Sequence, residues 1–196
     1  NKPNSIKEFN EKIFALHFNK YVPKTLITSN IEKIKDFYEL HKKIIVKPLD
    51  GMGGISIYKI DDLNEDNLNI INEMTNSEQT KIICQEFLED IYDGDFRVLI
   101  IHGEPFEKTL ARIPQKGNFK GNLAAGGKGT AMDISDFQRK LGEEIGEYLI
   151  KMGINFAGID IIGEYLTEIN ITSPTCAREI YEQTGINPIT RYFEGL

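Results

Sequence analysis

Two short apolar strands on either side of a Gly-Glu turn constrain this chain more than any other feature. Residues 156–162 and 165–171 fit an antiparallel hairpin, because each is rich in isoleucine and the turn residues lie between them. A turn centred on Glu164 places Asp160 directly opposite Glu168. Side chains alternate between the two faces of a strand, so Asn170 shares a face with Glu168.

Two carboxylates that face each other repel and destabilise a sheet, but a divalent cation bound between them makes their pairing favourable. Magnesium prefers oxygen ligands and usually takes one or two carboxylates together with substrate phosphates. Asp160, Glu168 and the amide oxygen of Asn170 therefore predict a metal site. The alternative is a solvated polar face on an edge hairpin, which the surrounding isoleucines disfavour.

A second pattern joins a buried-type strand at 44–46 to Lys47 and then to a glycine-rich turn at 51–54. Glycines allow close backbone approach, so successive amides can cradle phosphate oxygens that Lys47 neutralises. The spacing is not that of a P-loop. An ordinary tight hairpin is equally compatible with this turn.

Residues 114–130 form a long glycine-rich segment with interspersed lysines, directly after a strand that contains Arg112. Long segments without periodicity are usually lids or binding loops, and a basic lid can close over an anionic ligand. The alternative is a disordered surface loop. Further along, Ser173 and Thr175 lie in a hydroxyl-rich turn that can hold a carboxylate, cap a helix, or do both.

The remaining pattern predicts an α+β chain with mostly antiparallel sheets and helices on one side. A capping box at Ser5 begins the first predicted helix, 5–18. The other predicted helices are a segment after Asn30, about 66–75, 133–152 and a region after 175. The other predicted strands are 25–28, 55–60, 82–87, 96–101 and 106–113.

Charge and composition limit the classes of partner and the compartment expected for this chain. The net charge of -7 argues against nucleic acid, whose affinity depends on cations that neutralise phosphates. No apolar run approaches the ~18 residues of a membrane span. Cys84 and Cys176 have no metal-binding spacing and favour two buried thiols in a reducing compartment.

Five segments together resemble the prokaryotic type of glutathione synthetase, a member of the ATP-grasp superfamily. They are KPLDGMGG (47–54), DGDFRVL (93–99), LARIP (110–114), GNLAAGG (121–127) and GIDIIGEYLTEINITSPT (158–175). The resemblance implies an ATP-grasp fold in which two α+β lobes grip ATP. Residues 1–88 would be the first lobe and 89–196 the second, with the family's N-terminal substrate domain absent from the chain.

The resemblance also implies roles by motif position. The implied nucleotide contacts are Lys12, Lys47, Gly51, Met52, Gly53, Gly54, Glu86, Phe87, Leu88, Asp95 and Arg112. The implied ligands of magnesium, with manganese also possible, are Asp160, Glu168 and Asn170. Arg112 and Lys47 would be catalytic, and residues 113–128 would be a mobile lid. The residues implied near the peptide substrate are Asn122, Asn170, Ser173 and Thr175.

The implied reaction is the ATP-dependent ligation of γ-glutamylcysteine to glycine through an acyl phosphate, which yields glutathione, ADP and phosphate. The implied enzyme is cytoplasmic and, when full-length, a homo-oligomer. Two alternatives remain open: a different ATP-grasp carboxylate-amine ligase, and a catalytically inert ATP-binding fragment.

Overall fold

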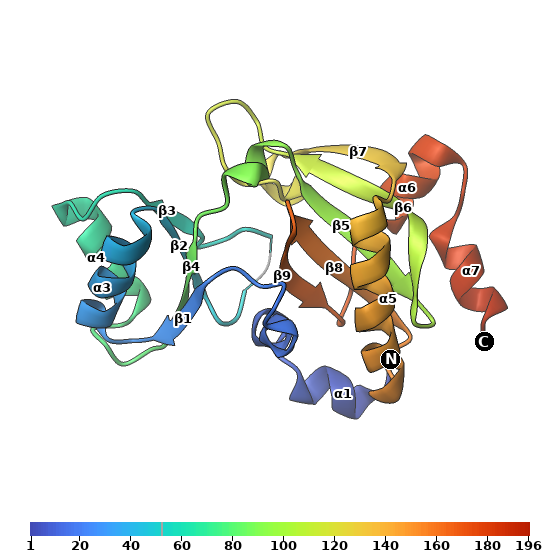
Figure 1. Cartoon of the computed structure of the whole chain (residues 1–196), viewed down its shortest axis with the longest axis horizontal. Coiled ribbons are helices and arrows are strands. Elements are labelled where there is room, and N and C mark those ends of the chain that lie inside the picture. The colour runs from blue at the N-terminus through green and yellow to red at the C-terminus, as the bar shows by residue number, and fades with distance from the viewer. Residues whose placement is uncertain (52) are drawn as a thin grey trace. The chain divides into compact units, whose positions relative to one another are not determined.

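The computed structural model describes residues 1–51 and 53–196, so Met52 of the glycine-rich turn lies outside the described residues (Figure 1). The chain divides into two compact units. The smaller unit is Pro23–Glu89, and the larger unit combines Asn1–Val22 with Asp90–Leu196. The smaller unit ends at Glu89, next to the lobe boundary expected at residue 88. The segment Asn1–Val22, however, folds with the larger unit rather than with the residues that follow it.

The smaller unit is a four-stranded antiparallel sheet in the order β1-β4-β2-β3. Its elements are β1 (Thr25–Thr28), α3 (Ile31–His41), β2 (Ile44–Pro48), β3 (Tyr58–Ile60), α4 (Glu65–Met74) and β4 (Ile82–Glu86). Both helices cover one face, where Ile34 and Ile71 pack on Val46 and Cys84. Lys47 points to the opposite face, since side chains alternate along β2.

The larger unit is a five-stranded antiparallel sheet in the order β7-β6-β5-β8-β9. Its strands are β5 (Asp95–Ile101), β6 (Glu104–Ile113), β7 (Lys128–Asp133), β8 (Phe156–Ile162) and β9 (Tyr165–Asn170). Its helices are α1 (Pro3–Glu8), α2 (Glu11–Phe14), α5 (Asp136–Lys151), α6 (Ala177–Thr184) and α7 (Pro188–Glu194). Short 3₁₀ turns occupy η1 (Ala15–Phe18), η2 (Glu89–Tyr92) and η3 (Leu123–Ala125).

Helices cover both faces of this sheet, so the prediction of helices on one side is wrong for the larger unit. On one face, Leu141 and Ile145 of α5 pack against Val98, and α5 runs along the sheet in Figure 1. On the other face, Ile180 of α6 packs against Leu99. The short helices after residue 175 fold back onto the second face because its apolar residues would otherwise face water.

The N-terminal segment also differs from the single helix predicted over 5–18. Pro3 begins α1, and Ser5 lies inside the helix and donates to the backbone oxygen of Met152 instead of capping. Asn10 then caps α2. The segment joins the larger unit because Phe14 and Phe18 enter its core.

Most other predicted elements are confirmed. Asn30 caps α3 by accepting from Lys33 N, and both cysteines are buried and unbridged. The strand predicted at 55–60 begins only at Tyr58, and β7 ends the predicted 114–130 loop at residue 127.

Candidate functional site

The hairpin of β8 and β9 has the predicted register. Asp160 pairs with Glu168, and Gly158 pairs with Asn170. Asn170 Nδ2 lies 3.3 Å from Gly158 O and 3.4 Å from Asp160 Oδ2. The three side chains proposed as metal ligands therefore occupy one face of the hairpin.

Two arginines surround Asp160. Arg97 grips it with two hydrogen bonds, from Nε to Oδ1 and from Nη2 to Oδ2, the latter at 2.7 Å. Arg112 Nη2 lies 3.0 Å from Asp160 Oδ1 and 2.6 Å from Asp95 Oδ2, as ion pairs without hydrogen-bond alignment. All four residues are buried. Charges this deeply buried persist only when they are paired.

Strand pairing explains why these charges meet. Asp95 of β5 stands opposite Arg112 of β6, and Arg97 of β5 stands opposite Asp160 of β8. Residues that face each other across paired strands point to the same side of the sheet. Gly158 leaves room for this arrangement, since a Cβ there would lie 2.7 Å from Arg97 Cδ.

The pKa values of Asp95 and Asp160 shift in opposite directions. Burial raises the pKa of Asp95 to about 6. Burial would also raise the pKa of Asp160, but Arg112 and Arg97 outweigh it and lower that pKa to about 2. Asp160 is therefore ionised at neutral pH, as a metal ligand must be. Asp95 Oδ1 is buried and has no hydrogen-bond partner among the described residues.

Sequence reasoning missed the role of Arg97. No motif pairs it with Asp160, which is 63 residues away. The available signal was an arginine near the start of the otherwise apolar run 96–101, because such a residue is buried only with a partner.

Several other predicted residues lie around this cluster. Lys12 Nζ is 3.1 Å from Glu168 Oε1, and Thr175 Oγ1 accepts from Arg97 Nη1 at 3.4 Å. Ser173 is exposed and lines a cavity of about 380 Å³ beside α7. Asn122 belongs to the predicted lid, where its backbone oxygen accepts from Gly127 N. Within the described part of the chain, neither Ser173 nor Asn122 forms a hydrogen bond or ion pair with the charged cluster.

The remaining predicted residues belong to the smaller unit. Lys47 is buried in β2, and three turn glycines have positive φ: Gly51, Gly53 and Gly54. Glu86 ends β4, and Phe87 N donates to Lys43 O at 3.0 Å. Leu88 N has no hydrogen-bond partner in residues 1–51 and 53–196, so this donor is available to a ligand.

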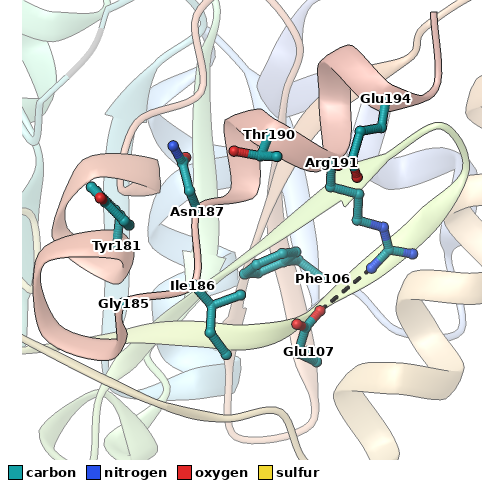
Figure 2. A pocket seen from close by; sticks show the side chains of 9 residues that line it. All are labelled: Phe106, Glu107, Tyr181, Gly185, Ile186, Asn187, Thr190, Arg191 and Glu194. Carbon is teal, nitrogen blue, oxygen red and sulfur yellow. Dashed lines mark hydrogen bonds and ion pairs between the residues drawn. The ribbon is translucent and has the colours of Figure 1, made fainter.

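A cavity of about 570 Å³ opens between β6, α6 and α7 (Figure 2), and no predicted site residue lines it. Figure 2 shows Arg191 directed at Glu107, and the two side chains are 3.4 Å apart. Its lining offers no acidic cluster or glycine turn of the kind the sequence analysis identified. This hollow is therefore separate from the candidate site.

The predicted ligands provide three oxygen donors for a hard cation only if the amide oxygen of Asn170 is counted with the carboxylates of Asp160 and Glu168. Within the described ranges, no group of three or more His, Cys, Asp or Glu side chains could hold a metal ion. Asp160 and Glu168 supply two carboxylates, and Asn170 supplies the third oxygen. This composition suits magnesium, which completes its shell with water and phosphate oxygens.

The model of a known family matches residues 11–185, and its description is the ATP-grasp domain of prokaryotic glutathione synthetase. The chain belongs to this family. Its fold is accordingly the α+β ATP-grasp fold. The match includes the charged cluster, the glycine turn and the predicted lid.

Relatives and solved structures agree with this assignment. The chain is 49% identical to glutathione synthetase of Buchnera aphidicola subsp. Baizongia pistaciae over 100% of its own length and 61% of the relative's. It is 48% identical to glutathione synthetase of Escherichia coli K12, covering 92% of this chain and 57% of the relative. The chain thus spans about three fifths of the length of the relatives it matches.

Among solved structures, the ATP-grasp ligase PsnB, in complex with a precursor variant, Mg and ADP, superposes with a TM-score of 0.69 at 19% identity. That match covers 99% of this chain and 60% of PsnB. D-alanyl-alanine synthetase A of Vibrio cholerae gives a TM-score of 0.67 at 16% identity, covering 98% of this chain and 65% of that one. At such identities the likeness shows the fold alone. None of the described helices is long and apolar enough to cross a membrane.

Proposed function

We propose that this chain is the ATP-grasp part of a glutathione synthetase, which ligates γ-glutamylcysteine to glycine with ATP and releases glutathione, ADP and phosphate. The observation that supports this most is the buried cluster in which Arg97 and Arg112 hold Asp160 beside Glu168 and Asn170. The two lobes of the active enzyme would be the two compact units, Pro23–Glu89 and Asn1–Val22 with Asp90–Leu196. The proposed setting is the cytoplasm, with a homo-oligomeric full-length enzyme.

Asp160, Glu168 and Asn170 would hold magnesium, or manganese. When bound, the metal neutralises phosphate charge. Lys12, Lys47 and the turn at Gly51–Gly54 would add positive charge and backbone donors around the same phosphates. The backbone of Glu86, Phe87 and Leu88 would bind adenine, and Asp95 would lie near the ribose.

The proposed phosphoryl transfer requires positive charge, which Arg112 and Lys47 would supply. A carboxylate is a poor electrophile, so the γ-phosphoryl group of ATP is transferred to the dipeptide carboxylate, which forms an acyl phosphate and ADP. Charge spreads over the moving phosphoryl oxygens, and Arg112 and Lys47 would stabilise it. The amine of glycine then attacks the acyl carbon, loses a proton and expels phosphate.

An acyl phosphate hydrolyses readily, so water must be excluded from it. Residues 113–128 would act as the lid. In the structure, Gln115 Nε2 donates to Gly126 O at 2.8 Å, which closes the base of this segment. Asn122, Ser173 and Thr175 would contact the peptide substrate together with Asn170.

The deciding experiment is a coupled assay of ADP release with ATP, magnesium, γ-glutamylcysteine and glycine. We expect ADP only when γ-glutamylcysteine and glycine are both present. ADP release when D-alanine replaces both of these substrates would indicate a different ATP-grasp ligase. Magnesium-dependent thermal stabilisation by ATP without ADP release would indicate an inert nucleotide-binding fragment.

A further inference from the structure

Glu86 is held from two sides where β4 ends. Its Oε1 accepts a hydrogen bond from Lys24 N at 2.8 Å, and its Oε2 lies 3.6 Å from Nδ1 of His41. The side chains of His41 and Glu86 are only 15% and 27% exposed. Both carboxylate oxygens are therefore engaged inside the smaller unit.

His41 is itself fixed in place. It is the last residue of α3, and Lys42 ends the helix in the left-handed conformation. The imidazole packs on Phe37 with ring centroids 4.4 Å apart. His41 thus presents Nδ1 to Glu86 from a rigid element.

The same carboxylate organises the backbone that follows. Glu86 N donates to Lys24 O at 3.1 Å, while Lys24 N donates back to the Glu86 side chain, so the two residues are joined twice. Phe87 N donates to Lys43 O at 3.0 Å on the other side. Residues 86 and 87 are therefore fixed between the start of β1 and the start of β2, immediately before the available donor of Leu88.

We propose that His41 is a positioning residue for the nucleotide: acting through Glu86, it fixes the backbone of residues 86–88 against which the adenine base lies. This inference rests on the proposed function. Backbone groups that are already in place bind a ligand without a further ordering cost. Removal of His41 should therefore weaken nucleotide binding more than it changes the chemical step.

The test is calorimetric titration of the protein with ADP in the presence of magnesium. We expect His41→Leu to weaken ADP binding about fivefold or more, which is the size of effect that loss of a positioning contact produces. His41→Gln keeps a donor in reach of Glu86 and should bind ADP close to the wild-type level. The matched control is Lys35→Gln, which breaks the 2.8 Å Lys35–Glu32 pair on the same helix and should leave ADP binding unchanged.

A double-mutant cycle separates this role from a general loss of stability. In a Glu86→Ala background, His41→Leu should cause no further loss of ADP affinity. The inference is overturned if His41→Leu binds ADP like the wild type, or if its effect is as large without Glu86. Should His41→Leu not fold, Glu86→Gln decides in its place: weaker ADP binding supports the inference, and unchanged binding overturns it. A wild-type protein that does not bind ADP would contradict the proposed function itself, and the inference with it.

Discussion

One face of the five-stranded sheet carries two regions of opposite chemistry on the same strands. Toward one end, β5, β6 and β8 present charged side chains: Asp95, Arg97, Arg112 and Asp160. Leu99 and Ile101 continue along β5 away from these charges, and Leu110 of β6 pairs with Arg97 at their border; these apolar side chains pack against Ile180 of α6. Both regions are buried, yet they contribute to stability in different ways.

The apolar region is stabilised by removal of its side chains from water. The charged region gains less, because desolvation of buried ions can exceed their mutual attraction, and well-packed apolar residues there are often neutral or stabilising. We therefore interpret the charged region as a functional site and the apolar region as its support. The four predictions that follow test this contrast.

The largest effect is expected at the proposed metal ligands. Asp160→Asn or Glu168→Gln removes a negative charge from the proposed magnesium site, so magnesium-dependent turnover should fall by about 1,000-fold or more. Steady-state ADP formation measures it. Glu164→Gln, at the exposed turn of the same hairpin, is the control and should keep the wild-type rate. Near-normal rates in both ligand variants would refute the metal assignment.

Arg112→Ala should come next. We expect kcat to fall about 100-fold with a much smaller change in ATP affinity, because the guanidinium is proposed to stabilise charge that develops during phosphoryl transfer. Arg178→Ala removes an exposed arginine of α6 and serves as the matched control. If the loss were confined to ATP affinity, Arg112 would only hold the nucleotide.

Leu110→Ala tests the apolar region. Its side chain is fully buried, so the free energy of unfolding should fall by about 2–5 kcal/mol, as for other large-to-small core substitutions. Urea unfolding measures this loss, and kcat of the folded variant should stay near the wild-type value. Leu40→Ala, at a side chain that is 76% exposed, should change stability little. A variant with normal stability but no activity would reverse the roles assigned to the two regions.

The smallest stability effect is expected at Lys12. Its ion pair with Glu168 is partly exposed, so Lys12→Gln should cost less than about 1 kcal/mol of unfolding free energy. If Lys12 also contacts ATP phosphates, KM for ATP should rise several-fold in steady-state assays. A large loss of stability with unchanged KM would make Lys12 a structural residue.

The sequence predicted local features well. The Asp160–Glu168 pair was predicted from a turn position and side-chain alternation, and the structure has that pair, although the register shifts between Asp160 and Ile161. The cap at Asn30 was likewise local.

Features that depend on distant partners were not predictable in the same way. Arg97 meets Asp160 only because β5 pairs with β8, and no local pattern specifies that pairing. The N-terminal segment joins the larger unit because Glu11 accepts from the backbone of Ile171 and Thr172 while Phe14 enters the distant core. Of the candidate site, the pairing of the residues proposed as metal ligands could be predicted from the sequence, and the arginine that holds Asp160 could not.

The most direct test of the charged region is calorimetric titration of wild-type and Glu168→Gln protein with ADP, each with magnesium and with EDTA. We predict that magnesium raises the ADP affinity of the wild type about tenfold or more, and that Glu168→Gln binds ADP with the same weak affinity in both conditions. Full magnesium dependence in Glu168→Gln would contradict the account.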